Sequence, residues 1–226
     1  MSAEAGSKTD TRDDATLKRA VFEAALPHLA EDGFGEKSLN AAAATANVDA
    51  ATLQRLFPNA GQDLADAFSA WADERMDATL AGATLSEMKI RERIKAAVRA
   101  RLAALRPHKE AARRAAAFLS LPQNAALTAK LLYRTVDNMW RAAGDTSTDF
   151  NFYTKRAILA GVYSSTLLRW FTDASEDEKD TNEFLDARIE NVMQFEKFKA
   201  QVNDQLSKFP SLTELLSHLS GRPPSA

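Results

Sequence analysis

The chain has 226 residues, a formal net charge of −2 and a hydrophobic content of 45%, with 8 Gly, 7 Pro and no Cys. Strong helix formers dominate this composition, which favours an all-α fold. The lack of Cys excludes disulfides and thiolate metal sites, and the balanced charge lacks the basic bias that is typical of dedicated nucleic-acid-binding proteins.

The first residues predict a tail. Residues 1–14 are acidic and contain no apolar stretch, so we expect them to be disordered. They resemble neither a secretory signal nor an Arg-rich mitochondrial presequence.

Residues 15–64 predict a unit of three helices. Apolar residues recur at steps of three and four along the first helix, which ends at Gly33, a residue that favours a C-terminal cap. Two short helices follow, at residues 38–46 and 50–56, and Asp49 is the expected N-cap of the second one. Two short helices joined by a tight turn are typical of a helix-turn-helix unit.

The rest of the chain predicts longer helices. They form a larger helical domain over residues 65–202, and Pro residues and polar turns separate them. Their expected ranges are 62–80, 87–105, 109–119, 125–142, 151–171 and 178–202. An amphipathic helix is expected over residues 203–220, before a disordered tail at 221–226. No apolar run reaches the roughly 18 residues that a transmembrane helix needs.

Three features of the N-terminal unit resemble the DNA-binding domain of TetR-type repressors. They are the Gly33-Phe34 turn, the Ala-rich stretch 41–46 and the Leu53 to Pro58 segment. The resemblance implies a TetR-like fold, in which a three-helix helix-turn-helix subdomain precedes a larger C-terminal helical domain.

The charge of the same unit argues against DNA binding. Residues 15–64 carry four cations and six acids, whereas affinity for DNA comes mainly from cations placed against phosphates. The expected recognition helix offers only Thr52, Gln54 and Arg55 for contacts to DNA. We therefore expect no DNA partner, and a ligand-responsive TetR-type repressor remains the alternative.

The chain shows no catalytic motif. Its three histidines, His28, His108 and His218, are far apart and have no metal-ligand spacing. It contains neither a nucleophile elbow nor a phosphate-binding Gly-rich loop. The sequence therefore predicts a protein that is not an enzyme and that needs no cofactor or metal.

One corner, between two predicted helices, is unusually rich in aromatic and charged residues. Asp137 and Trp140 lie within one helical turn of each other, as do Phe152, Tyr153 and Arg156. Aromatic side chains exposed beside Arg are typical of protein interfaces. The other interpretation is that these aromatics belong to the core and that the polar residues cap helices.

The same corner resembles the signature of the Coq-nine family of ubiquinone biosynthesis proteins. Phe152 occupies a position where relatives often have Trp, and the segment Phe184 to Ile189 also fits. The matching residues are Asp137, Met139, Trp140, Gly144, Asp145, Ser147, Thr148, Asp149, Phe150, Asn151, Tyr153, Thr154, Arg156 and Ala157.

The resemblance implies a non-catalytic protein that binds an isoprenoid quinone precursor, or another long-chain lipid, in its larger helical domain. It implies docking on demethoxyubiquinone hydroxylase, and a homodimer that forms through the helices near 151–171 and 178–202. The implied docking residues are Met139, Trp140, Asp149, Phe152, Tyr153 and Arg156.

The resemblance also implies a membrane contact. Apolar residues of the last helix form a narrow stripe, which can lie in a membrane interface or pack on its own domain. The implied membrane-binding residues are Phe209, Leu212, Leu215, Leu216 and Leu219. We expect a bacterial protein in the cytoplasm, peripheral on the inner face of the cytoplasmic membrane.

Overall fold

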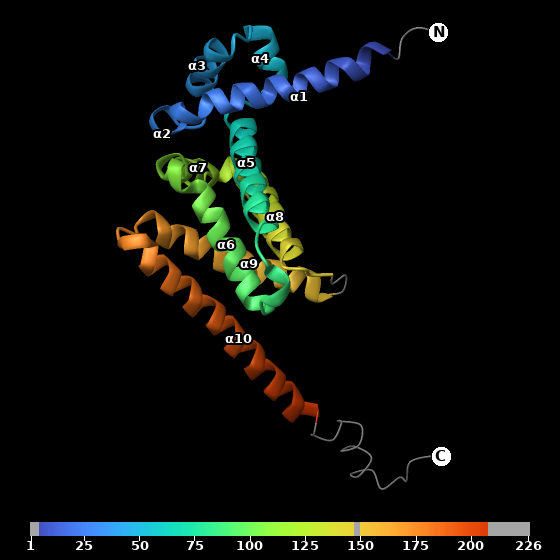
Figure 1. Ribbon diagram of the computed structural model, residues 1–226, viewed down its shortest axis with the longest axis vertical. Coiled ribbons are helices and arrows are strands. Elements are labelled where there is room, and N and C mark those ends of the chain that lie inside the picture. The colour runs from blue at the N-terminus through green and yellow to red at the C-terminus, as the bar shows by residue number, and fades with distance from the viewer. Residues whose placement is uncertain (1–4, 147–149, 208–226) are drawn as a thin grey trace.

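A computed structural model describes residues 5–146 and 150–207, and the regular structure of these residues is entirely helical (Figure 1). The helices are α1 (Ala5–Ala25), α2 (Leu29–Asp32), α3 (Glu36–Ala46), α4 (Ala50–Leu56), α5 (Gly61–Ala81), α6 (Ile90–Leu105), α7 (Lys109–Leu119), α8 (Ala125–Ala142), α9 (Phe150–Phe171) and α10 (Lys179–Ser207). Short 3₁₀ turns join several of them. No helix in the described part of the chain is both long and apolar enough to cross a membrane.

Helices α1 to α4 form a separate unit at one end of the molecule (Figure 1). Gly33 ends α2 with a φ of 73°, and Asn47 ends α3 in the left-handed region with a φ of 56°. Asp49 caps α4, because its carboxylate accepts a hydrogen bond from the backbone N–H of Thr52 at 2.9 Å. The predicted N-cap and the predicted glycine turn are therefore confirmed.

The predicted tail is wrong for residues 5–14, which form the first half of α1. Our prediction relied on apolar periodicity, which marks only helix faces that are buried. A solvated polar stretch without Pro can be helical and leave no such signal. Near the end of this stretch, the Asp14 carboxylate forms an ion pair with Arg55 of α4.

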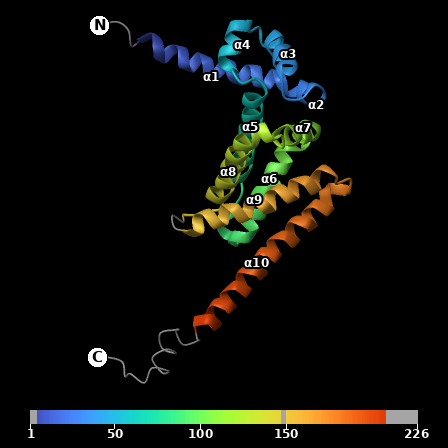
Figure 2. The ribbon, with the colours of Figure 1, turned by 180° about the vertical axis from the view of Figure 1, so that it is seen from behind.

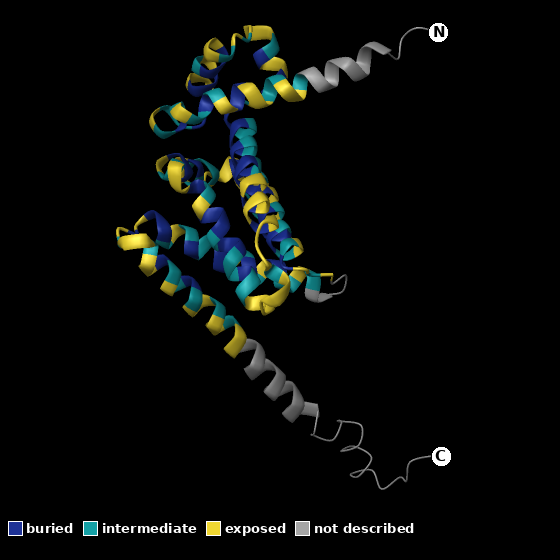
Figure 3. Cartoon of the chain, viewed as in Figure 1, coloured by how far each residue is buried: buried dark blue, intermediate teal, exposed yellow. Residues whose placement is uncertain are grey.

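Helix α5 connects the N-terminal unit to the larger domain (Figures 1 and 2). Its buried residues recur at helical steps, from Leu64 through Phe68 and Ala72 to Met76 and Leu80. This face packs against α6 and α8. Figure 3 shows buried residues along α5 and α6 and also within the N-terminal unit.

Helix α10 packs on α9 and α6 through its first half, where Arg99 binds the side chains of Asn182 and Asp186. The helix extends to Ser207, so its predicted end at residue 202 is wrong. No Pro or Gly interrupts the chain at this point, and nothing local ends the helix there.

The turn between α9 and α10 is built around Asp173, which is buried. Its carboxylate accepts four hydrogen bonds, from the backbone N–H and the hydroxyl of both Ser175 and Thr181. Burial by itself raises the pKa of Asp173, but these hydrogen bonds outweigh it and hold the pKa well below its usual value.

We expect the Asp173→Asn variant to lower the free energy of unfolding at pH 7 by about 1–3 kcal/mol, because it removes charge-assisted hydrogen bonds. The depressed pKa stabilises the fold fully above the unfolded value of 3.8, and this contribution shrinks as the pH falls below it. Urea unfolding between pH 3 and 7 measures the difference. The matched control is Asp177→Asn, at an exposed position of the same turn. An equal difference between wild type and Asp173→Asn at pH 3 and pH 7 would contradict this account.

Candidate functional site

A cavity of about 250 Å³ lies among helices α5 to α9. Most of its wall is apolar, and the short side chains of α7 leave the space open because Ala cannot fill it. The apolar wall includes Phe68, Leu105, Ala115, Leu119, Leu131 and Leu167. Such a lining with few polar groups is typical of a site for an apolar ligand.

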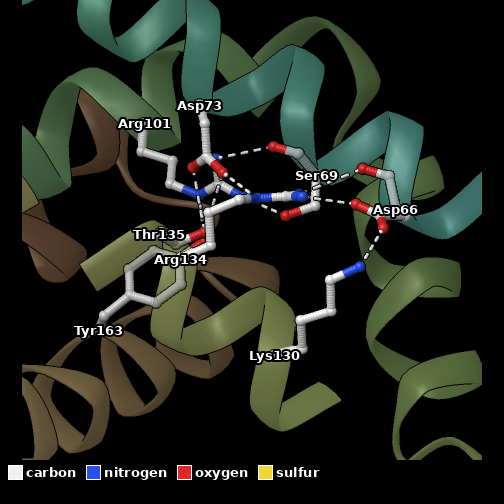
Figure 4. A network of polar contacts seen from close by, with 8 residues as sticks. All are labelled: Asp66, Ser69, Asp73, Arg101, Lys130, Arg134, Thr135 and Tyr163. Carbon is white, nitrogen blue, oxygen red and sulfur yellow. Dashed lines mark hydrogen bonds and ion pairs between the residues drawn. The ribbon is translucent and has the colours of Figure 1, made fainter. Parts of the chain in front are cut away.

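One wall of the cavity is polar and contains a buried ion pair. Arg101 of α6 is 4% exposed and pairs with Asp73 of α5. The Nε–H of Arg101 donates to the Tyr163 hydroxyl at 2.9 Å, and its Nη2–H donates to the Ser69 hydroxyl at 3.2 Å. The Thr135 hydroxyl donates to Asp73 at 3.0 Å. Figure 4 shows that this network joins side chains from α5, α6, α8 and α9.

The network continues outward through Arg134, which bridges Asp73 and Asp66 (Figure 4). Lys130 also binds Asp66, at 2.9 Å. Burial raises the pKa of Asp66, but the hydrogen bonds from Lys130 and Arg134 outweigh it, so this pKa lies below its usual value. The carboxylates and guanidinium groups of the network are thus paired with one another, which suits a structural and binding role.

Within the described residues, no group of three or more His, Asp or Glu side chains is placed to hold a metal ion. His108 packs edge-on against Trp71, with 5.2 Å between ring centroids. Burial, and then the charge of Arg75, lowers its pKa. His28 lies 4.0 Å from Asp32 in the N-terminal unit, and His218 is outside the described residues.

The structure brings most of the predicted docking residues together where α8 meets α9. Tyr153 is 66% exposed, and Phe152 stacks edge-on against it. Trp140 is half-buried, and its indole N–H donates to the backbone oxygen of Lys155 at 3.1 Å. Asp149 lies outside the described residues.

Two of the predicted docking residues are buried, so their expected place on the surface is wrong. Met139 is fully buried, because it shares the core-facing side of α8 with Val136 and Ala143. Arg156 is 3% exposed and binds the carboxylates of Asp137 and Asp145. Among the predicted docking residues that the structure describes, the exposed surface therefore consists of Tyr153 with parts of Phe152 and Trp140.

The four cations of residues 15–64 all have partners within the chain. Arg55 pairs with Asp14, Lys37 with Asp32 and Arg19 with Glu23, while Lys18 lies 5.2 Å from the Phe57 ring. Each of these contacts would compete with a DNA phosphate for the cation. The geometry thus adds to the charge argument against DNA binding.

The predicted membrane-binding residues all lie outside the described part of the chain. They are Phe209, Leu212, Leu215, Leu216 and Leu219.

The sequence is similar to several curated proteins. A family model described as COQ9 matches residues 125–196. Ubiquinone biosynthesis protein COQ9, mitochondrial, from Rattus norvegicus is 33% identical over 81% of this chain and 61% of that protein. The Homo sapiens protein of that name is 31% identical over 81% of this chain and 60% of its own length. The chain thus spans about three fifths of the length of these relatives.

The fold is similar to that of a solved transcription factor. The crystal structure of the TetR transcriptional regulator from Nitrosomonas europaea has a TM-score of 0.60 and 22% sequence identity, over 77% of this chain and 96% of that one. At this identity the likeness concerns the fold alone. It confirms the predicted all-α, TetR-like architecture.

The predicted bacterial location is wrong. The curated relatives from Rattus norvegicus, Homo sapiens and Dictyostelium discoideum are all mitochondrial proteins, and none supports a place on a bacterial cytoplasmic membrane. Our prediction relied on the composition of the N-terminus, which does not identify the compartment.

We expect the Asp73→Asn variant to lower the free energy of unfolding by about 3–5 kcal/mol, because it leaves the buried charge of Arg101 without its counterion. Chemical denaturation measures the loss. Glu74→Gln, at the adjacent exposed position, is the matched control and should change stability by less than about 0.5 kcal/mol. Removal of both charges, as in an Asp73→Leu, Arg101→Met double variant, should recover part of the loss. Similar stabilities for Asp73→Asn and wild type would show that the pair does not hold the helices together.

Proposed function

The chain belongs to the COQ9 family, and we propose that it acts in ubiquinone biosynthesis as a non-catalytic protein that binds an isoprenoid quinone precursor and presents it to a hydroxylase. The observation that carries this proposal is the apolar cavity among α5 to α9, which lies in the same domain as the exposed aromatic corner. The residues that match the family model, 125–196, include α8 and α9, and these two helices contribute to both features.

The volume of the cavity limits how much of a ligand it holds. Pockets that enclose a whole drug-sized ligand usually measure about 300–1,000 Å³, and this one measures about 250 Å³. It therefore suits one part of a long lipid, either a ring or the end of a chain. The remainder of the lipid would stay outside, as presentation to a partner requires.

The partner we propose is demethoxyubiquinone hydroxylase, which would dock at the corner of Trp140, Phe152 and Tyr153. Tyr and Trp contribute disproportionately to binding energy at protein interfaces. Tyr153 exposes 66% of its surface, and the Phe152 ring lies edge-on to it with 5.1 Å between ring centroids. A Tyr side chain has few rotatable bonds, so it loses little entropy when a partner covers it.

Two further parts of the proposal rest on sequence. The apolar stripe of Phe209, Leu212, Leu215, Leu216 and Leu219 would contact a membrane surface, where burial of each Leu contributes ~1.5 kcal/mol or more. A homodimer would form through α9 and α10, and Leu168 of α9, which is 63% exposed, supplies an apolar contact for it.

The rival candidate is a ligand-responsive repressor, which would share the fold and the cavity. The contacts that the four cations of residues 15–64 make within the chain disfavour it. A gel shift with upstream DNA at low salt tests it directly, since binding through phosphates must weaken steeply as salt rises.

We expect protein purified from a quinone-producing host to carry isoprenoid quinones or other long-chain lipids, detectable by native mass spectrometry and solvent extraction. The Ala116→Phe variant should carry at least about fivefold less, because Ala116 lines the cavity and a phenyl ring would occupy the space. Ala117→Phe, at the adjacent exposed position, should carry as much as wild type. A wild-type protein that carries no lipid, and takes none from liposomes, would remove the proposed mechanism.

We expect the Tyr153→Ala variant to bind demethoxyubiquinone hydroxylase more than about tenfold less tightly, with unchanged thermal stability, because it removes an exposed aromatic anchor. Surface plasmon resonance against the immobilised hydroxylase measures the change. The control is Tyr133→Ala, which removes a tyrosine of α8 that is 47% exposed and lies away from the corner. Equal affinities for wild type and Tyr153→Ala would place the docking surface elsewhere.

A further inference from the structure

We infer that Arg101 and Tyr163 form a hydrogen-bond donor site in the wall of the cavity, which selects ligands that carry a neutral oxygen acceptor on a ring, such as a ketone. This inference rests on the proposed lipid binding and specifies which part of the lipid the cavity takes. It concerns the ring of the ligand rather than its chain.

The first observation concerns the N–H donors of Arg101 and the acceptors that they bind. A guanidinium group has five N–H donors. Four are used, by the Tyr163 hydroxyl, the Asp73 carboxylate and the backbone and side-chain oxygens of Ser69. Among the residues that the structure describes, the fifth N–H has no protein acceptor, and it belongs to a side chain that is 4% exposed and lines the cavity.

The second observation is the hydroxyl of Tyr163. It accepts the hydrogen bond from Arg101 at 2.9 Å, but its own O–H donates to no acceptor in the described part of the chain. Tyr163 is 5% exposed and also lines the cavity. A tyrosine hydroxyl can donate as well as accept a hydrogen bond, so an acceptor on a ligand would use the donor that remains.

The surrounding charges favour a neutral acceptor. The positive charge of Arg101 is already balanced by Asp73. The other two cations of the network, Arg134 and Lys130, bind Asp66 and do not line the cavity. A ligand carboxylate would add a second negative charge next to Asp73 and would lose its own hydration on entry, which is costly without a free counterion. A ketone or ether oxygen carries no such cost.

The donors are also held in place before any ligand arrives. Arg101 is bound by groups of α5 and α9, and Asp73 is bound in turn by Thr135 of α8 (Figure 4). Side chains fixed in this way lose little entropy when a ligand binds, so their hydrogen bonds contribute to selectivity.

The experiment compares three probes that have the same chain length: a decyl-substituted benzoquinone, decylbenzene and decanoic acid. Equilibrium dialysis with mass-spectrometric detection gives the affinity of the full-length protein for each probe. We expect wild type to bind the quinone roughly three- to tenfold more tightly than decylbenzene, which corresponds to one or two neutral hydrogen bonds. Decanoic acid should bind no more tightly than decylbenzene.

The Tyr163→Phe variant should prefer the quinone over decylbenzene less strongly than wild type does, because one of the two donors is lost and Arg101 remains, while its affinity for decylbenzene stays within about twofold of wild type. Retained binding of decylbenzene shows that the variant is folded. Tyr133→Phe, at an exposed position outside the cavity, should keep the wild-type preference.

Equal affinity of wild type for the quinone and decylbenzene would overturn the inference without any variant, and would leave the proposed lipid binding in place. A preference for decanoic acid, or an unchanged quinone preference in Tyr163→Phe, would also overturn it. Binding of none of the three probes would remove the lipid-binding part of the proposed function together with the inference.

Discussion

The buried ion pair between Arg101 and Asp73 constrains the arrangement of the larger domain. Removing both charges from water costs several kcal/mol per ion, and the pair is tolerable only because hydrogen bonds satisfy both groups. The partners come from α5, α6, α8 and α9 (Figure 4). A shift of any of these helices would break contacts of the network and leave a buried charge without its partners in an apolar environment. The network thus fixes one packing of the helices and keeps open a cavity that apolar side chains alone would tend to fill.

The cavity and the exposed corner share two helices, and this shared support would link the proposed lipid binding to the proposed docking. Helix α8 provides Thr135 to the polar wall of the cavity and Asp137 to the ion pairs of the corner. Helix α9 provides Tyr163 to the wall and Tyr153 to the exposed surface, ten positions apart. On an α-helix, ten residues span about 15 Å. A ligand in the cavity and a protein at the corner would therefore contact the same rigid elements over a short distance.

Much of the fold was predictable from the sequence, whereas the polar wall was not. The bounds of α4, α7 and α8 were predicted correctly, because Pro, Gly and an Asp cap mark them directly. Asp73, Arg101 and Tyr163 lie on three helices and meet only after folding. One signal existed: Arg101 occupies a position on the apolar face that Val98, Leu102 and Leu105 define. A charged residue on such a face must be paired once it is buried.

For the corner where α8 meets α9, sequence reasoning failed in a different way. The pattern indicated correctly that aromatic and charged residues gather there, but it did not separate the exposed ones from the buried ones. Arg156 is buried because the carboxylates of Asp137 and Asp145 neutralise it, one from α8 and one from the loop that follows. Its guanidinium also lies 3.3 Å from the centroid of the Phe152 ring, which it orients. Arg156 therefore lies beneath the aromatic surface, and in the proposed docking it would act through its neighbours without touching the partner.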